Sequence, residues 1–274
     1  MKKGINQCCF PPSFPVRKVL ELAQSTGFRG VELRVTGDGE VAYTRAPSDL
    51  ANLAEQARQR ELERYSLSTL LHWHYPLSSR DPAVRAEGIT IGLSMIRAAS
   101  VIGANTVLIV PGVGDPEVPY RETYRIAQES IHILSETASR LNVQIGVENV
   151  WNYFLQSPLE MLSFIEEIGS PYVGAYLDVG NVMAVGYPQH WIELLGEHIV
   201  KVHIKDYSRD IRNSRGFTFL LHGDVSWDSV LRELKAIGYD DFLTPELAAP
   251  KAFNAALVHG ISGSLDAIMG EESS

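Results

Sequence analysis

The sequence predicts a single-domain (β/α)8 barrel, and three observations predict it. Short apolar runs alternate with helical segments along all 274 residues, eight of each. No break in composition divides the chain, and 45% hydrophobic residues are enough for one continuous core. An open doubly wound sheet rarely needs eight uniform repeats, and without a Gly-x-Gly-x-x-Gly turn after a strand a dinucleotide site has no support. We therefore expect one domain over residues 1–274.

The predicted strands are short apolar runs bounded by polar residues, Gly or Pro. They cover, in order, residues 3–9, 31–34, 66–71, 106–110, 143–148, 173–178, 199–203 and 242–246. Runs of this kind are typical of strands that are buried on both faces. They therefore favour a parallel sheet with helices on its outer side.

Each predicted strand is followed by a segment with helical spacing or with helix-end residues. The predicted helices cover residues 16–25, 48–62, 82–102, 120–141, 158–168, 189–196, 226–238 and 252–269. Asp81-Pro82 and Ser157-Pro158 each place a capping residue before a Pro in the first turn, the positions at which these residue types are favoured. The last four residues, 271–274, are expected to fray.

Charge and composition limit the classes of function. A net charge of −9 weighs against a polyanionic partner such as nucleic acid. No stretch approaches 18 apolar residues and the start lacks a signal-peptide core, so we expect no membrane partner. Cys8 and Cys9 are adjacent and predicted to be unbridged, which indicates a reducing, cytoplasmic setting. A homo-oligomer is compatible with this composition.

The last four predicted strands each end in a side chain that can bind a metal ion. These side chains are Glu148, Asp178, His203 and Glu246. Singly, each carboxylate would more often cap a helix or form a salt bridge, but the carboxyl ends of all barrel strands face one opening. Three carboxylates and an imidazole gathered there would repel one another without a cation. We therefore predict one divalent ion, Mn²⁺ before Mg²⁺, Co²⁺ or Zn²⁺, because the ligands are mostly oxygen.

Three further residues are predicted to contact a substrate. Asn181 stands three residues past Asp178, and Arg209 stands six past His203, in loops that reach the same opening. His72 follows the third predicted strand, where a polar and aromatic edge would suit the face of a sugar. Each of them has the alternative role of holding its own loop in place.

Other charged and glycine-rich segments have local interpretations. Glu32 and Arg34 end the second predicted strand and are interpreted as an ion pair at the opening. Lys205 and Asp206 are interpreted as a local ion pair. The loop 111–114, Pro-Gly-Val-Gly, offers backbone amides that are suited to an anion.

Five segments resemble the xylose isomerase-like barrel superfamily of sugar and sugar-phosphate isomerases and epimerases. They are Val147–Asn149, Leu177–Asn181, Val202–Asp206, His222–Trp227 and Pro245-Glu246. Within it, the chain looks most similar to ketose 3-epimerases of the tagatose and psicose type and to L-ribulose- or L-xylulose-5-phosphate 3-epimerases. The resemblance implies a metal-dependent carbohydrate isomerase with one ion on the four strand-end ligands, and with Glu148 and Glu246 as its acid/base pair.

The chain departs from the free-ketose epimerases at two positions. Those enzymes usually have a His where this chain has Asn181, and a Glu where it has Phe154. An Arg six residues beyond the metal-binding His is retained as Arg209. This pattern resembles the phosphopentulose branch more closely.

The chemistry of epimerisation agrees with these roles. Inverting the carbon beside a carbonyl requires removal of a weakly acidic proton and stabilisation of a cis-enediolate. It also requires one acid/base group on each face of that carbon. Glu148 and Glu246 come from opposite ends of the four-strand arc, so we predict that they invert C3 of a ketose or ketose phosphate.

Three alternatives remain open for the same barrel. An aldose–ketose isomerase such as hydroxypyruvate isomerase would exchange a C1 or C2 proton instead. An endonuclease IV-like enzyme would need three zinc ions, more histidines and a basic face. A non-catalytic sugar-binding barrel would keep its function after Glu148→Gln and Glu246→Gln.

Overall fold

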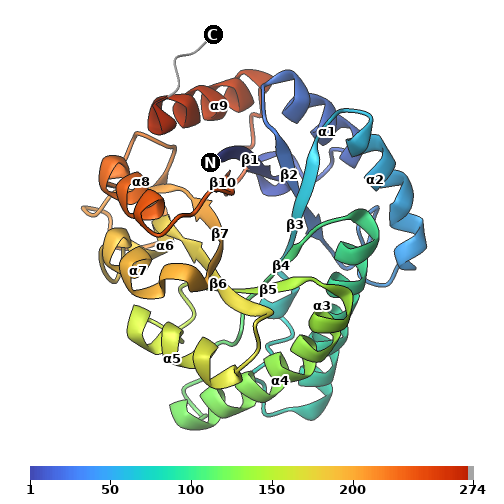
Figure 1. Ribbon diagram of the computed structural model, residues 1–274, viewed down its shortest axis with the longest axis vertical. Coiled ribbons are helices and arrows are strands. Elements are labelled where there is room, and N and C mark those ends of the chain that lie inside the picture. Colours follow the sequence, from blue (N-terminus) through green and yellow to red (C-terminus); the bar gives the residue numbers. More distant parts are fainter. Residues whose placement is uncertain (271–274) are drawn as a thin grey trace.

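Eight parallel strands close into a barrel in the computed structural model, which describes residues 1–270 (Figure 1). The strands are β1 (Lys2–Asn6), β2 (Gly30–Val35), β3 (Glu63–Thr69), β4 (Thr106–Ile109), β5 (Gln144–Glu148), β6 (Val173–Asp178), β7 (Ile199–Ile204) and β10 (Phe242–Pro245). They follow one another around the ring in chain order, and β10 pairs with β1. The predicted barrel is confirmed. Residues 271–274, predicted to fray, lie outside the described residues.

Helices surround this ring on its outer side (Figure 1). They are α1 (Val16–Ser25), α2 (Ala51–Arg58), α3 (Pro82–Ile102), α4 (Tyr120–Leu141), α5 (Pro158–Ile168), α6 (Val179–Val182), α7 (Pro188–Leu195), α8 (Trp227–Ala236) and α9 (Ala255–Met269). Short 3-10 turns are η1 (Gln7–Cys9), η2 (Pro47–Leu50), η3 (Leu71–Trp73), η4 (Gly196–His198) and η5 (Ser214–Gly216). Asp81 and Ser157 accept hydrogen bonds from first-turn amides, as their sequence positions predict.

Some boundaries differ from the prediction, and the differences have local causes. The first strand stops at Asn6, because the Asn6 side chain accepts a hydrogen bond from the Cys8 amide and starts η1. The second predicted helix divides into η2 and α2. Its expected end is instead a turn through Glu61, whose φ is +57°. The third strand consequently begins earlier than predicted, at Glu63.

Two short elements at the carboxyl ends of the strands were not predicted from the sequence. One is the single turn α6, directly after β6. The other is an antiparallel pair, β8 (Asp206–Tyr207) with β9 (Phe217–Thr218), inside the long loop that follows β7. The rings of Trp151, Tyr207 and Phe217 pack together there, with centroids 4.7–5.6 Å apart. Aromatic packing therefore stabilises a pair of strands too short for an alternating sequence pattern.

The barrel interior carries a polar layer as well as the apolar core. Buried apolar side chains of strands and helices form one large continuous cluster. Asn6, Glu32 and Ser66 are buried in consecutive strands, and the register pairs Asn6 with Glu32 and Glu32 with Ser66. Their polar atoms lie below the end of the barrel at which the strands terminate, here called the mouth. Buried polar groups need partners, so this layer is part of the site above it.

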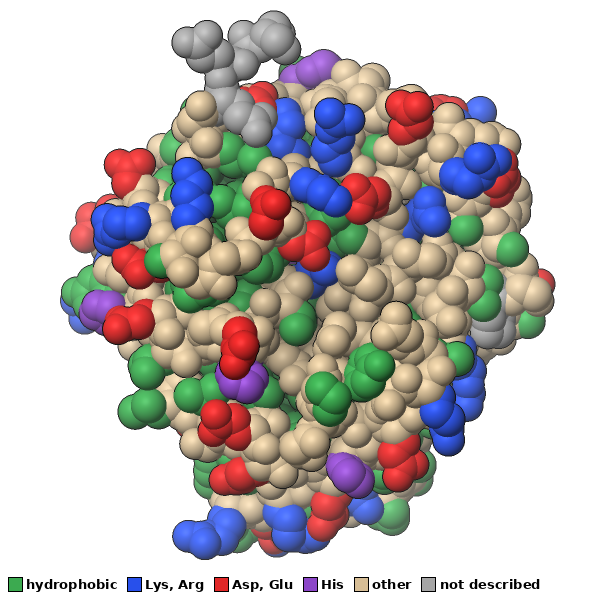
Figure 2. All heavy atoms as spheres, viewed as in Figure 1, with side chains coloured by type: hydrophobic (Ala, Val, Ile, Leu, Met, Phe, Trp, Pro, Cys, Tyr) green, Lys and Arg blue, Asp and Glu red, His purple; other side chains and the backbone are tan. Residues whose placement is uncertain are grey.

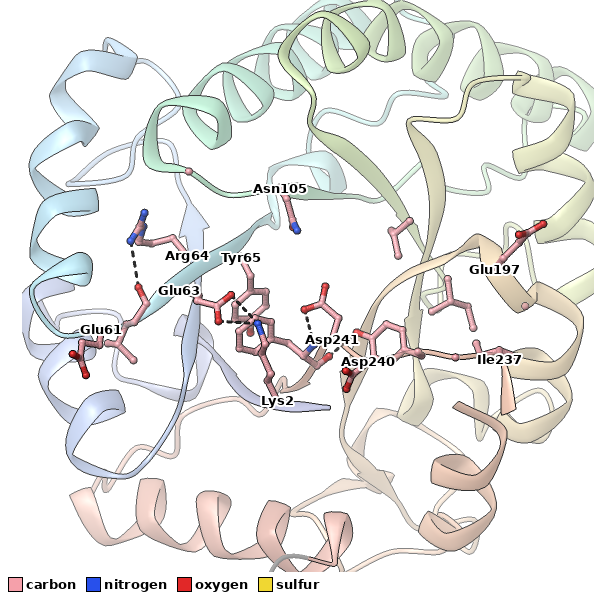
Figure 3. A pocket seen from close by; sticks show the side chains of 18 of the residues that line it. Lys2, Glu61, Glu63, Arg64, Tyr65, Asn105, Glu197, Ile237, Asp240 and Asp241 are labelled. Carbon is pink, nitrogen blue, oxygen red and sulfur yellow. Dashed lines mark hydrogen bonds and ion pairs between the residues drawn. The ribbon is translucent and has the colours of Figure 1, made fainter. Parts of the chain in front are cut away.

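The opposite end of the barrel, here called the floor, surrounds an open cavity of about 840 Å³ (Figure 3). Ion pairs at this end join Lys2 to Glu63, at 2.8 Å, and buried Lys201 to Asp241, at 2.5 Å. The ring of Tyr65 stacks on Phe242, with centroids 3.9 Å apart. In (β/α)8 enzymes the chemistry takes place at the other end, so we assign these pairs to stability.

Two surface properties bear on possible partners. Within residues 1–270, no helix combines the length and the apolar character needed to cross a membrane. On the face shown in Figure 2, Lys and Arg side chains alternate with Asp and Glu and do not gather into a patch of one sign. This face therefore carries no extended field of one sign.

Candidate metal centre and active site

The four strand-end residues predicted from the sequence converge at the mouth. Glu148, Asp178, His203 and Glu246 each offer one ligand atom, and these atoms all lie within 4.8 Å of one another. Three of the side chains are buried, and that of Glu246 is partly exposed. They come together because their strands β5, β6, β7 and β10 are neighbours in the ring. The arrangement is a possible metal centre.

His203 presents one nitrogen to the carboxylates and the other to the polar layer below. Around Nδ1 lie Glu148 Oε1 at 3.3 Å, Glu246 Oε2 at 3.7 Å and Asp178 Oδ2 at 4.0 Å. Nε2 lies 2.8 Å from Glu32 Oε1. In the neutral ring, a proton on Nε2 that is donated to Glu32 leaves the Nδ1 lone pair facing the cluster.

Glu32 is a buried carboxylate that the sequence did not assign to the site. It is 0% exposed and accepts hydrogen bonds from the Tyr176 hydroxyl and the Asn6 amide as well as from His203. Burial raises its pKa, but the charge and hydrogen bond of His203 lower it below the ordinary value. The predicted ion pair with Arg34 is wrong: across the described chain the two side chains form no contact within 4 Å, because Glu32 lies one layer deeper.

Asp178 is fixed by its neighbours so that one oxygen remains for a ligand. Its Oδ1 caps α6 by accepting the Asn181 amide at 2.7 Å. The side chain of Asn149 bonds both the backbone amide of Asp178, at 2.8 Å, and its carbonyl, at 3.0 Å. Oδ2 is buried and faces the Lys205 ammonium, 2.6 Å away. A buried carboxylate oxygen needs a positive partner, and a metal ion can take that place as an ammonium does here.

Lys205 is a second functional candidate, and the sequence predicts the wrong partner for it. Its ammonium lies 2.6 Å from Asp178 Oδ2 and 2.6 Å from Glu246 Oε2. Its predicted local ion pair with Asp206 is wrong. The Asp206 carboxylate instead accepts hydrogen bonds from the Val225 amide and the Trp227 indole. The stem of Lys205 passes so close to Gly180 that an added Cβ would lie 2.4 Å from Cγ. Glycine therefore permits the approach of this lysine to the cluster.

The two glutamates differ in their preferred protonation state. Burial raises the pKa of Glu148 to about 7, and the charge of Glu246 acts in the same direction. Burial also raises the pKa of Glu246, but the charges of Lys205 and His203 outweigh it and lower that pKa to about 2. Two carboxyl groups whose environments separate their pKa values are suited to act as acid and base.

Comparison with known proteins places this fold and site in a family. The family model described as "Xylose isomerase-like TIM barrel" matches residues 20–266. This protein belongs to that family. The resemblance noted in the sequence is thereby confirmed.

Individual relatives within the xylose isomerase-like family include named epimerases. L-ribulose-5-phosphate 3-epimerase UlaE of Escherichia coli (strain K12) is 27% identical over 240 residues, which are 86% of this chain and 83% of that protein. A structure of L-ribulose 3-epimerase has a TM-score of 0.82 at 22% identity and covers 98% of this chain and 93% of its own. The IOLI protein, with a bound zinc atom, has a TM-score of 0.82 at 20% identity and covers 98% of both chains. At these identities the structural likenesses show the fold.

The donor set of this xylose isomerase-like barrel fits a divalent ion. It consists of three carboxylates and one imidazole nitrogen, with Oδ2 of Asp178 4.0 Å from Nδ1 of His203. Oxygen-rich ligation of this kind suits Mn²⁺ or Mg²⁺, and His with carboxylates also binds Zn²⁺. The ammonium of Lys205 against two of these oxygens shows that they attract positive charge.

The other predicted substrate residues lie in loops beside the centre. Asn181 donates its amide to the Asn149 carbonyl at 2.9 Å and lines a cavity of about 270 Å³. Arg209 donates to the Gly186 carbonyl at 2.8 Å, and its guanidinium lies 4.4 Å from the centre of the Tyr187 ring. Both residues therefore support loops that border the mouth. Their contact with a substrate stays a prediction.

The glycine-rich loop 111–114 uses its amides within the protein. The Val113 amide donates to the Ser78 hydroxyl at 3.0 Å, and the Gly114 amide donates to the Asn152 carbonyl at 2.7 Å. These two donors are consequently engaged, and they do not form the anion-binding loop that the sequence suggested.

His72 lies beneath its loop and has no exposed edge. It is 0% exposed, and its Nε2 lies 3.2 Å from the Gly88 carbonyl. Its Nδ1 is buried without a hydrogen-bond partner among the residues that the structure describes. Burial therefore lowers the pKa of His72 from 6.5 to about 4, and the Gly88 carbonyl opposes this shift only in part. Its predicted contact with a substrate stays a prediction.

The buried His72 predicts a loss of stability in mild acid. Its pKa is lower in the folded protein than in the unfolded chain, so the unfolded chain binds the proton first. This contribution is complete above pH 6.5 and falls as the pH drops toward about 4. Between pH 7 and pH 5 we expect a loss of about 2 kcal/mol from this group. Urea unfolding of the wild type and His72→Gln at both pH values measures it; an equal loss in the two proteins contradicts the assignment.

Proposed function

We propose that this protein is a metal-dependent epimerase that inverts C3 of a ketose or ketose phosphate. The observation that carries the proposal is the placement of Glu148 and Glu246 beside Nδ1 of His203, with Asp178 completing a set of metal ligands. Two carboxyl groups of opposite protonation preference next to a cation site are what C3 inversion requires. The relatives named as 3-epimerases support the same reaction class.

The chain's own residues divide the proton transfers between them. Glu246, ionised, takes the proton from C3 of the ketose, and a cis-enediolate forms. Glu148, protonated, returns a proton to the opposite face of C3. The two groups finish with exchanged protonation states, so turnover in the reverse direction uses them in the opposite roles. A divalent ion held by the four ligands, Mn²⁺ in the first instance, would supply the positive charge that stabilises the enediolate.

Two further residues support these transfers. Lys205 contacts Glu246 at 2.6 Å and favours its ionised form, which is the form a base requires. Glu32 accepts from Nε2 of His203 and holds the ring so that Nδ1 faces the ligand set. The two residues act on different sides of the cluster: Lys205 contacts Glu246, and Glu32 lies behind the imidazole of His203.

The residues at the mouth favour a small sugar or sugar phosphate as substrate. Asn181 and Phe154 stand where free-ketose epimerases usually have His and Glu, which favours a phosphopentulose over a free hexulose. Phe154 is fully buried, against Tyr120, Tyr124 and Phe164, so it fills the loop and offers no polar contact. A charged group in its place would need a different loop packing.

Hydrogen exchange in D₂O tests the reaction. The Mn²⁺-loaded protein is incubated with pentuloses, hexuloses and their 5- or 6-phosphates, and NMR follows deuterium at each carbon. We expect deuterium at C3 and appearance of the C3 epimer, with both lost after treatment with a chelator and restored by Mn²⁺. Exchange at C1 or C2 with formation of an aldose would instead identify an aldose–ketose isomerase. No exchange with any of these sugars would refute the proposal.

A further inference from the structure

Arg34 is an arginine at the mouth without an acidic partner. Glu32 on the same strand points into the barrel, so Arg34, two residues on, points the same way and lies one layer nearer the mouth. Its register partner is Ser68 of β3. Within residues 1–270, its half-buried guanidinium forms no ion pair within 4 Å and donates no hydrogen bond. An arginine held in this way has five donors free for a ligand.

Arg34 also stands across the mouth from the candidate metal centre. In the ring order, β2 is four strands from β6 in either direction, so Arg34 is opposite Asp178. A substrate whose reacting carbon lies between Glu148 and Glu246 extends its remaining carbons away from β5–β7, toward this wall.

Other cationic or anion-binding groups at the mouth are already engaged. Lys205 contacts Asp178 and Glu246, and Arg209 bonds the carbonyl of Gly186. The Val113 and Gly114 amides of loop 111–114 bond other parts of the protein. Arg34 therefore differs from them in that its guanidinium donors are not engaged by the described protein.

We propose that Arg34 binds an anionic group, a phosphate monoester or a carboxylate, at the end of the substrate remote from the reacting carbon. The planar fork of arginine matches both oxyanions through two parallel hydrogen bonds. Arg34 is thus a specificity-determining residue that selects charged sugars over neutral ones. This inference rests on the proposed epimerase function for its orientation of the substrate, and its test separates the two.

Binding of sugars that cannot enolise tests the inference without turnover. Calorimetry on the Mn²⁺-loaded protein compares xylitol, xylitol 5-phosphate and the carboxylate xylonate. We expect the wild type to bind one of the two anions at least about tenfold more tightly than xylitol, and which anion is preferred distinguishes phosphate from carboxylate. In Arg34→Met the preference disappears, whereas affinity for xylitol is unchanged. Equal affinity for charged and neutral ligands in the wild type overturns the proposal.

Kinetics provide the second measurement and the control. Arg34→Met is expected to raise KM for an anionic ketose about 10- to 100-fold with little change in kcat, and Arg34→Lys to recover part of the loss. Arg212→Met, at an exposed arginine of the loop after β8, serves as the matched control and should change neither value. A similar rise in KM for a neutral ketose would show a structural effect and refute the inference. A wild type that binds the anion but epimerises no ketose refutes the proposed function and leaves the anion site standing.

Discussion

Replacing Glu246 by glutamine is expected to lower kcat for ketose epimerisation about 1,000-fold. The substitution keeps the size of the side chain and removes the carboxylate that abstracts the C3 proton. It also removes the ionised partner of Lys205, whose ammonium lies 2.6 Å from Glu246 Oε2. Glu148→Gln should have a comparable effect, because it removes the acid on the opposite face. Steady-state rates with the ketose identified by D₂O exchange measure both losses.

Metal content has to be separated from proton transfer in this experiment. Both glutamates are candidate ligands, so the variants are assayed at saturating Mn²⁺, and their bound metal is quantified. Glu63→Gln, at an exposed ion pair of the floor, is the matched control and should retain full activity. A variant with bound metal that keeps more than a tenth of the wild-type kcat would contradict the acid/base assignment, and such a result would favour a non-catalytic sugar-binding barrel.

Replacing Glu32 by glutamine is expected to weaken Mn²⁺ binding about 10- to 100-fold, although Glu32 is not a ligand. Glu32 accepts the Nε2 proton of His203 at 2.8 Å and so keeps Nδ1 available to the ion. The amide of glutamine offers one neutral acceptor instead of two charged oxygens. Its NH₂ group replaces either Oε2, which accepts from Tyr176, or Oε1, which accepts from Asn6 and His203. His203 then loses its fixed orientation. Calorimetric titration of the metal-free proteins with Mn²⁺ measures the change.

A milder variant separates orientation from general loss of stability. Tyr176→Phe leaves the Glu32 carboxylate and its contact with His203 in place and removes only one hydroxyl donor. It should weaken Mn²⁺ binding less than Glu32→Gln does, even where thermal unfolding shows the two variants to be equally destabilised. Equal metal affinities for Glu32→Gln and the wild type would show that His203 needs no support from below.

The ligand set was predictable because strand ends in a closed barrel share one location. Glu148, Asp178 and His203 each interrupt an apolar run, and a buried strand has no place for an isolated charge. Burial and chain order therefore sufficed to bring them together. That argument does not single out Glu32, which lies inside β2, or Lys205, which follows the last residue of β7.

For Glu32 and Lys205, proximity in the sequence predicts the wrong ion-pair partners. Each was paired with a charged near neighbour in the chain, Arg34 or Asp206, although their actual partners belong to other strands. Alternation along a strand carried the correct information: Lys205 stands two residues after His203 and so faces the same interior. Which carboxylates Lys205 contacts depends on distances across the barrel, and only the closed ring determines these. The pair β8–β9 was missed for a related reason, since its stability comes from contacts with Trp151.

The ion-paired floor gives the molecule an inert side. The amine of Met1 lies 2.6 Å from Asp240 there, beside the cavity of Figure 3, while Glu246 leaves the same group of strands at the far end. A tether, fluorophore or fusion partner joined at Met1 would disturb an exposed salt bridge of small energetic weight. Immobilised in this way, the protein would present its open end to the solution, with substrates free to enter.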